Sequence, residues 1–376
     1  MTASTPIEAA LGSDEALTLA EIVEVSGRIR RAVEGIIEGK PEVVKLAVSV
    51  LLAEGHLLIE DVPGVGKTML AKALARSLDC TVRRVQFTPD LLPSDITGVS
   101  VFDQERREFE FKPGAIFANI VVGDEINRAS PKTQSALLEC MEERQVTVDG
   151  TTYILESPFM VIATQNPVEM EGTYPLPEAQ RDRFMAMVSM GYPSGAAELA
   201  MLDHHGRTSP LDDLEAVADA REVAKLIEAV REVHVSDAVR RYVIDLAAAT
   251  RTSPDLRLGA SPRATLQLVR VARAWAALDD RDYVIPDDVQ ELAVHVLPHR
   301  LLPTSESQIS RLDTSEIVAD LVSRVPLPDP APGAGSRPGS SSAPNSAAPF
   351  TAGGATGLTG RRRDSVGGAR DRRQGR

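Results

Sequence analysis

Cysteine is scarce in this sequence. Its 376 residues include two cysteines, Cys80 and Cys140, and neither belongs to a CxxC or Cys/His spacing. The chain is therefore neither a disulfide scaffold nor a zinc domain with a recognisable sequence pattern. Long apolar runs are also missing, because no stretch reaches the roughly 18 residues that a membrane-spanning helix needs. The acidic first residues do not form a secretory signal, so we expect a cytoplasmic protein without a membrane span.

Positive charge is outweighed by negative charge. Lys and Arg number 41 against 54 Asp and Glu, which gives a net charge of −13. Residues 326–376 hold eight Arg and three Asp, so residues 1–325 carry −18. An acidic folded part argues against nucleic acid as a partner. Residues 326–376 consist mainly of Pro, Gly, Ser, Ala and Arg, which bury too little apolar surface to fold, and we predict a disordered tail.

The apolar pattern predicts two domains. Helical spacing covers 17–52, and short apolar runs then alternate with helical stretches as far as Gly191. Five runs predict strands, at 56–62, 81–87, 118–125, 158–166 and 185–190. These runs are mostly apolar on both faces, which is typical of a parallel sheet covered by helices. We predict a flexible N-terminus at 1–16, an α/β core at 17–192 and an all-helical domain at 193–325.

A turn between the first predicted strand and an alanine-rich helix has the form of a phosphate-binding loop. It fits the pattern GxxxxGK[ST], except that Asp61 stands in place of the first glycine. Glycine lets backbone N–H groups surround a phosphate, while Lys67 would reach the β and γ oxygens and Thr68 would contact Mg²⁺. The sequence therefore predicts an ATP site formed by Pro63, Gly64, Val65, Gly66, Lys67, Thr68 and Met69.

Polar side chains follow two further predicted strands. Asp124 and Glu125 end the run IVVG, where Asp124 would hold Mg²⁺ partly through water and Glu125 would polarise the attacking water. Asn166 follows the run MVIATQ. Strand ends converge on the ligand in a doubly wound sheet, so we expect Asn166 to orient that water.

Arginines precede the last strand and begin a later helix. Arg181 and Arg183 lie just before the predicted strand at 185–190, where a guanidinium could reach a γ-phosphate that its own loop does not hold. Arg263 lies in the first turn of a helix that Ser261 would cap. A cation there opposes the helix dipole, so we expect it to be compensated by a nucleotide phosphate or by a surface salt bridge.

Five segments in order, EDVPGVGKT, VVGDEINRA, ATQNP, GTYPLPEAQRDRF and LGASPRA, resemble the MoxR family of AAA+ ATPases over about residues 20–325. The resemblance implies an AAA+ P-loop αβα core with a five-stranded parallel sheet, a helical lid and a ring, commonly a hexamer. The resemblance assigns the Walker A motif to Gly64, Gly66, Lys67 and Thr68, and the Walker B motif to Asp124 and Glu125. It assigns sensor 1 to Asn166 and sensor 2 to Arg263. The arginine finger is assigned to Arg183, with Arg181 and Arg128 as alternatives. It also implies that Ile37 and Gly39 lie near the adenine.

Two hairpins are predicted within the core. Residues 88–117 alternate apolar and charged residues around a turn at Gly98, and residues 144–159 contain the turn signal Asp149-Gly150. By resemblance they are the helix-2 insert and the pre-sensor-1 hairpin, which project from the ring and engage substrate in relatives.

The function that we expect is ATP-driven remodelling of a client protein, together with a partner that bears a von Willebrand factor A domain, as the resemblance implies. One alternative is a nucleotide-gated scaffold with slow turnover. Another is a magnesium-chelatase-like subunit that drives metal insertion. A DNA motor is disfavoured by the acidic folded part and by the absence of a basic, aromatic-interleaved groove.

Overall fold

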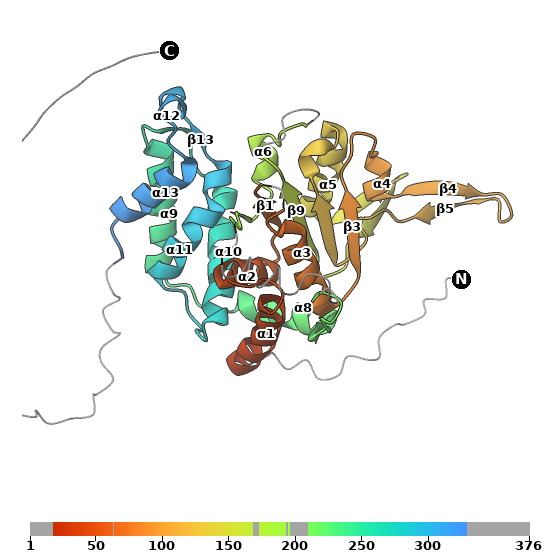
Figure 1. Cartoon of the computed structure of the whole chain (residues 1–376), viewed down its shortest axis with the longest axis horizontal. Helices are drawn as coiled ribbons and strands as arrows, with labels where there is room; N and C mark the ends of the chain where they lie inside the picture. The colour runs from red at the N-terminus through yellow and green to blue at the C-terminus, as the bar shows by residue number, and fades with distance from the viewer. Residues whose placement is uncertain (1–17, 63, 168–172, 193–194, 196–209, 329–376) are drawn as a thin grey trace, which may run out of the picture. The chain divides into compact units, whose positions relative to one another are not determined.

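The computed structural model describes residues 18–62, 64–167, 173–192, 195 and 210–328 (Figure 1). The helices are α1 (Leu19–Glu34), α2 (Pro41–Leu52), α3 (Lys67–Arg76), α4 (Pro93–Thr97), α5 (Pro131–Glu143), α6 (Glu178–Arg181), α8 (Ala220–Arg231), α9 (Asp237–Thr252), α10 (Pro262–Leu278), α11 (Pro286–Val296), α12 (Ser305–Ile309) and α13 (Thr314–Arg324), with 3-10 turns η1 (Ile126–Arg128) and η2 (Pro298–Arg300). The strands are β1 (Leu57–Glu60), β2 (Leu78–Asp79), β3 (Val82–Gln86), β4 (Val99–Asp103), β5 (Glu108–Lys112), β6 (Ile120–Asp124), β7 (Gln145–Val148), β8 (Thr151–Ile154), β9 (Met160–Gln165), β10 (Ala186–Val188), β11 (Ala218–Asp219), β12 (Leu256–Leu258) and β13 (Leu302–Pro303).

The core is a five-stranded sheet in the order β10-β1-β9-β6-β3, and every neighbouring pair is parallel. These are the five predicted strands, so the α/β fold with a parallel sheet is confirmed. The interior strands are apolar on both faces and buried, whereas the edge strand β3 is mostly exposed. Parallel strands end at the same edge of a sheet, and β1, β6 and β9 therefore bring the phosphate loop, Asp124 and Asn166 to one edge.

Local signals begin the helices that frame the core. Thr18 caps α1 through a reciprocal bond with Glu21, and Ile22, Ile29 and Val33 form its buried face. Proline occupies the first turn of α2, α5, α10 and α11. Backbone N–H groups in the first turn make no hydrogen bond within the helix, so the N–H that proline lacks is not needed there.

The helical part is organised around α10, which packs on α2, α8, α9 and α11. Trp275 and Tyr242 are buried there, and the ammonium group of Lys45 from α2 lies 3.8 Å from the centre of the Trp275 ring. A single apolar cluster continues from α1, α2 and the central strands into α8, α9, α10 and α11. The compact unit ends at Pro330, and the division of this unit at residue 193 stays a prediction.

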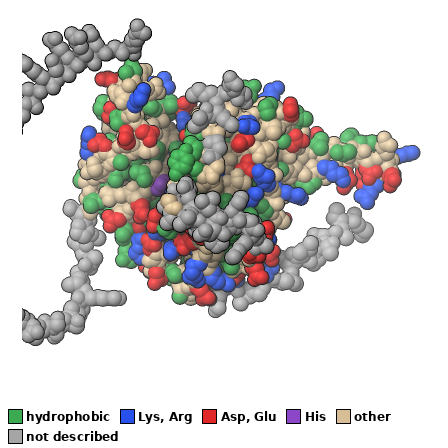
Figure 2. Space-filling view, in the orientation of Figure 1, with side chains coloured by type: hydrophobic (Ala, Val, Ile, Leu, Met, Phe, Trp, Pro, Cys, Tyr) green, Lys and Arg blue, Asp and Glu red, His purple; other side chains and the backbone are tan. Residues whose placement is uncertain are grey.

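Two hairpins extend from the core. The first hairpin consists of β4 and β5, and its chain reverses at 104–107. The hairpin was predicted, but the prediction that it turns at Gly98 was wrong. Gly98 instead lies at the base of the hairpin with φ +90°, where a Cβ atom would be 2.5 Å from the Lys112 carbonyl oxygen. The hairpin projects from the core and carries both apolar and charged side chains (Figures 1 and 2). The second hairpin, of β7 and β8, turns at Asp149-Gly150 as predicted, with positive φ at both residues.

Several predictions fall on residues that the structure does not describe. They are Pro63, the N-terminus at 1–16, residues 193–209 of the predicted all-helical domain apart from Gly195, and the tail apart from Pro326, Leu327 and Pro328. Within the described ranges, no helix is both long and apolar enough to cross a bilayer.

Candidate nucleotide site

The phosphate loop joins β1 to α3 at the carboxyl edge of the sheet. Gly64 and Gly66 have φ of +87° and +97°, a left-handed conformation that glycine adopts without a steric penalty. Gly66 is the N-cap of α3, so the loop leads directly into a helix N-terminus, which attracts anions. Val65 is half-buried and Met69 is exposed in the first turn of α3. The local geometry is therefore that of the predicted phosphate loop.

Lys67 and Thr68 connect this loop to the neighbouring strands. The Lys67 ammonium donates to the carbonyl oxygen of Gln165 at 3.1 Å and also to that of Asp61. The Thr68 hydroxyl donates to Oδ1 of Asp124 at 2.9 Å. The structure thus brings together the two side chains that the sequence assigns to Mg²⁺.

Asp124 and Glu125, at the end of β6, are held by side chains of the neighbouring strands β3 and β9. Asp124 is buried, and its Oδ2 accepts a 2.7 Å hydrogen bond from Nε of Arg84 on β3. Glu125 has a left-handed backbone (φ +58°), and its N–H donates to the Thr164 hydroxyl at 3.0 Å. Its Oε2 accepts from Gln86 Nε2 at 2.8 Å.

Sequence reasoning missed Arg84 and Gln86. Both lie on β3, whose pairing register places Gln86 opposite Asp124. The available signal was the polar character of the run TVRRVQF, in which Arg83, Arg84 and Gln86 lie between apolar residues. The pairing of β3 with β6 was needed to interpret that signal.

Asn166 follows β9, and Ile37 and Gly39, which the resemblance assigns to the adenine, lie before α2. Asn166 is buried directly after β9, and its carbonyl oxygen accepts from Asn127 Nδ2 at 3.2 Å. Ile37 is buried, and Gly39 has φ +74° in the turn before α2. The adjacent Lys40 ammonium donates to the carbonyl oxygen of Tyr192 at 3.3 Å, so this turn lies against the segment that follows β10.

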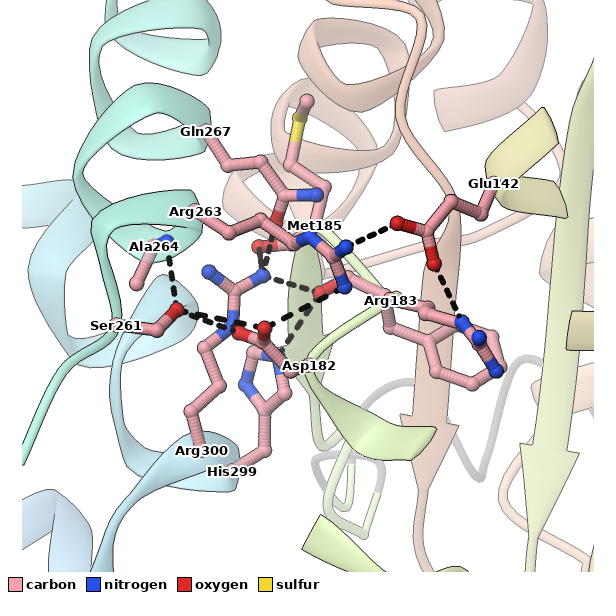
Figure 3. Close-up of polar contacts among 11 residues, drawn as sticks. Glu142, Asp182, Arg183, Met185, Ser261, Arg263, Ala264, Gln267, His299 and Arg300 are labelled. Atoms are coloured by element: carbon pink, nitrogen blue, oxygen red, sulfur yellow. Dashed lines mark hydrogen bonds and ion pairs between the residues drawn. The ribbon is translucent and has the colours of Figure 1, made fainter. Parts of the chain in front are cut away.

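Arg183 and Arg263 converge on one carboxylate, that of Glu142 at the end of α5 (Figure 3). Nε of Arg183 is 2.8 Å from Oε2 of Glu142, and Arg263 contacts Oε1. Arg263 also lies 3.5 Å from Asp182. Ser261 caps α10 as predicted, because its hydroxyl oxygen accepts from the N–H of Ala264. The charge of Arg263 at this helix start is compensated by salt bridges.

These arginines lie at the amino ends of the strands. The N–H of Met185 donates to the carbonyl oxygen of His56, directly before β1, and Nε2 of His56 contacts the carbonyl oxygen of Met141 on α5. The phosphate loop follows the other end of β1, and four strand residues span about 13 Å. Arg183, Glu142 and Arg263 are thus separated from the phosphate loop by the length of a strand.

The two alternative fingers have other surroundings. Arg128 pairs with Glu125 at 3.2 Å, on the same edge as the phosphate loop. Arg181 lies 3.9 Å from Glu178 on α6. Arg183 is therefore the candidate that adjoins Arg263.

A buried arginine joins α10 and η2 to the segment that carries Arg183. Arg300 is almost fully buried and donates to the carbonyl oxygens of Phe184 and Met185 and to the Gln267 side chain (Figure 3). Its Nε is 3.6 Å from Asp182. Burial lowers the pKa of Arg300 to about 10, and the group remains charged at neutral pH. The helical part thus fixes the backbone directly after Arg183.

Comparison with known proteins agrees with this geometry. Residues 56–186 match the model of the ATPase family associated with various cellular activities (AAA), and residues 248–321 match that of an AAA lid domain. Chaperone MoxR1 of Mycobacterium tuberculosis is 41% identical over 305 residues, which cover 79% of this chain and 80% of MoxR1. The chain belongs to the MoxR family of AAA+ ATPases.

Other relatives extend over similar lengths of this MoxR-family chain. The Bacillus subtilis protein YeaC is 49% identical over 302 residues, covering 80% of the chain and 94% of YeaC. A protein of Cytophaga hutchinsonii with a known crystal structure superposes with a TM-score of 0.76 at 36% identity, over 82% of this chain and 97% of that one. The predicted family and the AAA+ fold with a helical lid are confirmed.

Proposed function

We propose that this chain hydrolyses ATP at the carboxyl edge of its sheet. The observation that carries the proposal is the contact between Thr68 and Asp124, with Lys67 beside them at the start of α3. Glu125 and Asn166 follow the two adjacent strands and supply a carboxylate and an amide for the attacking water. The division of labour assigned from the sequence is therefore supported by the positions of these side chains.

The same side chains suit Mg²⁺. The hydroxyl of Thr68 and Oδ1 of Asp124 are oxygen ligands, which Mg²⁺ prefers, and they are close enough to share one ion. Thr68 would be a direct ligand, and Asp124 would act partly through water. Bound Mg²⁺ would neutralise charge that develops on the phosphates. Oδ2 of Asp124 remains held by Arg84, which fixes the orientation of the carboxylate.

We further propose that Arg183 and Arg263 act on the nucleotide of a neighbouring subunit. Both lie a strand length from the loop of their own chain and share Glu142. A neighbour in a ring can present its loop to them, and its γ-phosphate would compete with Glu142 for both guanidinium groups. This proposal changes the expectation for Arg263, which becomes a second arginine supplied in trans.

The cellular role follows by similarity. We propose a ring, commonly a hexamer in this family, that remodels a client protein together with a von Willebrand factor A domain partner. The relative named a chaperone supports this role. A nucleotide-gated scaffold and a magnesium-chelatase-like subunit remain the alternatives. The cytoplasmic location predicted from the sequence stays a prediction.

Steady-state ATP hydrolysis with Mg²⁺ tests the enzymatic proposal. We expect turnover by the wild type and none by Glu125→Gln, which keeps the shape of the side chain and removes the charge. A remodelling enzyme should turn over faster when partner and client are added, whereas a scaffold should show the same slow rate with and without them. Affinity capture with ATP-bound Glu125→Gln identifies the client. Equal turnover by wild type and Glu125→Gln would contradict the assignment of Glu125.

A further inference from the structure

Asp61 occupies the place where the general phosphate-loop pattern has its first glycine. The residue does not need to be glycine here, because Asp61 is not among the described residues with positive φ. Its side chain is largely buried at the end of β1. A buried carboxylate requires hydrogen-bond donors, and their identity indicates what the residue does.

Three donors contact this carboxylate. Oδ2 accepts from the hydroxyl of Ser189 at 2.8 Å and from the N–H of Gly191 at 2.6 Å. Oδ1 accepts from the N–H of Val62 at 2.7 Å. Burial raises the pKa of Asp61, but these hydrogen bonds lower it by more, and the net shift is downward. The side chain is therefore an ionised acceptor with both oxygens in use.

These bonds tie the start of the phosphate loop to both neighbouring strands. The carboxylate reaches the residues after β10, and the backbone N–H of Asp61 reaches the Gln165 carbonyl oxygen at the end of β9, at 3.4 Å. Lys67 donates to the carbonyl oxygen of Asp61 itself. The position of Asp61 therefore affects where the ammonium group of Lys67 lies.

The segment held by Asp61 also contacts other parts of the nucleotide site. A Cβ atom on Gly66 would lie 3.6 Å from Cε of Met190, so Met190 lies against the last glycine of the loop. Lys40 reaches the carbonyl oxygen of Tyr192 from the turn that the family resemblance places near the adenine. Asp61 thus connects the phosphate end of the site to its base end through residues 189–192.

We propose that Asp61 is a positioning residue for nucleotide binding, which holds the phosphate loop against residues 189–192. The inference rests on the proposed function. It has a counterintuitive consequence, because replacing Asp61 with glycine restores the general motif and yet should weaken binding. The substitution removes the acceptor for two backbone N–H groups and one hydroxyl, and it adds backbone freedom at the base of the loop.

Titration with fluorescent ATP and ADP analogues tests this inference. Asp61→Gly should raise the Kd of both nucleotides about tenfold or more, since it removes several hydrogen bonds to a charged acceptor. Asp61→Asn keeps one oxygen acceptor and should raise the Kd less, about threefold. At saturating ATP, kcat should stay within about twofold for both variants. Asp280→Gly makes the same exchange in an exposed turn after α10, and its Kd should equal that of the wild type.

Several outcomes overturn the inference. The inference is wrong if folded Asp61→Gly binds ATP and ADP with the same Kd as the wild type. It is also wrong if the kcat of this variant falls while its Kd stays unchanged. If Asp61→Gly melts before binding is measured, Asp61→Asn decides, and wild-type affinity of that variant rejects the role. A wild type that binds neither nucleotide rejects the proposed function as well, so the two failures are distinguished by the wild-type titration alone.

Discussion

The guanidinium groups of Arg183 and Arg263 contact different oxygens of one carboxylate, Glu142. One arginine precedes β10 and the other begins α10, so the contact joins the sheet domain to the helical part. Because the two arginines share one anion, we expect them to act on one phosphate together. The carboxylates of Glu142 and Asp182 beside Arg263 explain how a helix can begin with an arginine against its own dipole.

Mixing experiments distinguish action in trans from action in cis. Arg183→Ala and Arg263→Ala should each bind ATP almost normally and hydrolyse it poorly, since an arginine in trans is worth on the order of 10³ in rate. Each variant, mixed with Lys67→Ala, should recover activity above that of either protein alone. Interfaces then form between an intact loop and an intact arginine pair.

The control is a demonstration that subunits exchange in the mixture. If Arg263→Ala recovers nothing although Arg183→Ala does, Arg263 acts within its own subunit. If neither recovers, the trans role passes to Arg181 or Arg128, and the same mixing assay on each decides between them.

Substitutions in the loop and at the end of β6 should have separable effects. Lys67→Ala removes the charge that pairs with the β and γ phosphates and should abolish ATP binding. Glu125→Gln should bind ATP with wild-type affinity and lose hydrolysis, because only the water-polarising charge is gone. Fluorescent nucleotide titration and steady-state turnover measure the two properties. Tight binding by Lys67→Ala would reject the assignment of the loop.

Stability should fall on acidification because of His56. Val161 N–H donates to Nδ1 of His56, which fixes the neutral Nε2–H tautomer that donates to Met141. Burial lowers the pKa of His56 to about 4, against about 6.5 in the unfolded chain. The unfolded state then binds more protons, so stability is lost as the pH falls from about 7 towards 4. Between pH 7 and 5 this group alone should cost about 2 kcal/mol.

Urea unfolding at several pH values checks this effect. His56→Gln should show a weaker dependence of the unfolding free energy on pH than the wild type, by about that amount between pH 7 and 5. Identical dependences in the two proteins would show that His56 does not stay neutral in the folded state.

Removal of residues 331–376 should leave the folded unit intact. The compact unit ends at Pro330, and the composition of the remaining residues offers little apolar surface. The melting temperature should change by no more than a few degrees, and basal ATP hydrolysis should be unchanged. A larger fall in melting temperature would show that these residues stabilise the rest.

Local sequence determined the elements of this protein and much of its candidate site. Apolar runs specified the interior strands of the central sheet, because these parallel strands are buried on both faces. The edge strand β3 was also predicted, although it is mostly exposed. The glycines of the phosphate loop and the Ser261 cap were equally local signals, since each depends on the backbone within a few residues. The turn of the β4–β5 hairpin was misplaced, because a left-handed glycine marks a close backbone approach as readily as a reversal.

Tertiary structure alone decided which distant residues meet. Arg84 and Gln86 reach the carboxylates of β6 through strand pairing, and Asp61 reaches Ser189 because β1 lies beside β10. Strand order is not encoded in any single run, since every buried strand has a similar apolar pattern. The sequence left two partners open for Arg263, a nucleotide phosphate and a surface salt bridge, and only packing showed that Glu142 and Asp182 lie beside it. The physical reason is that side-chain partners are selected by the long-range burial of apolar surface, which brings together residues that no local spacing relates.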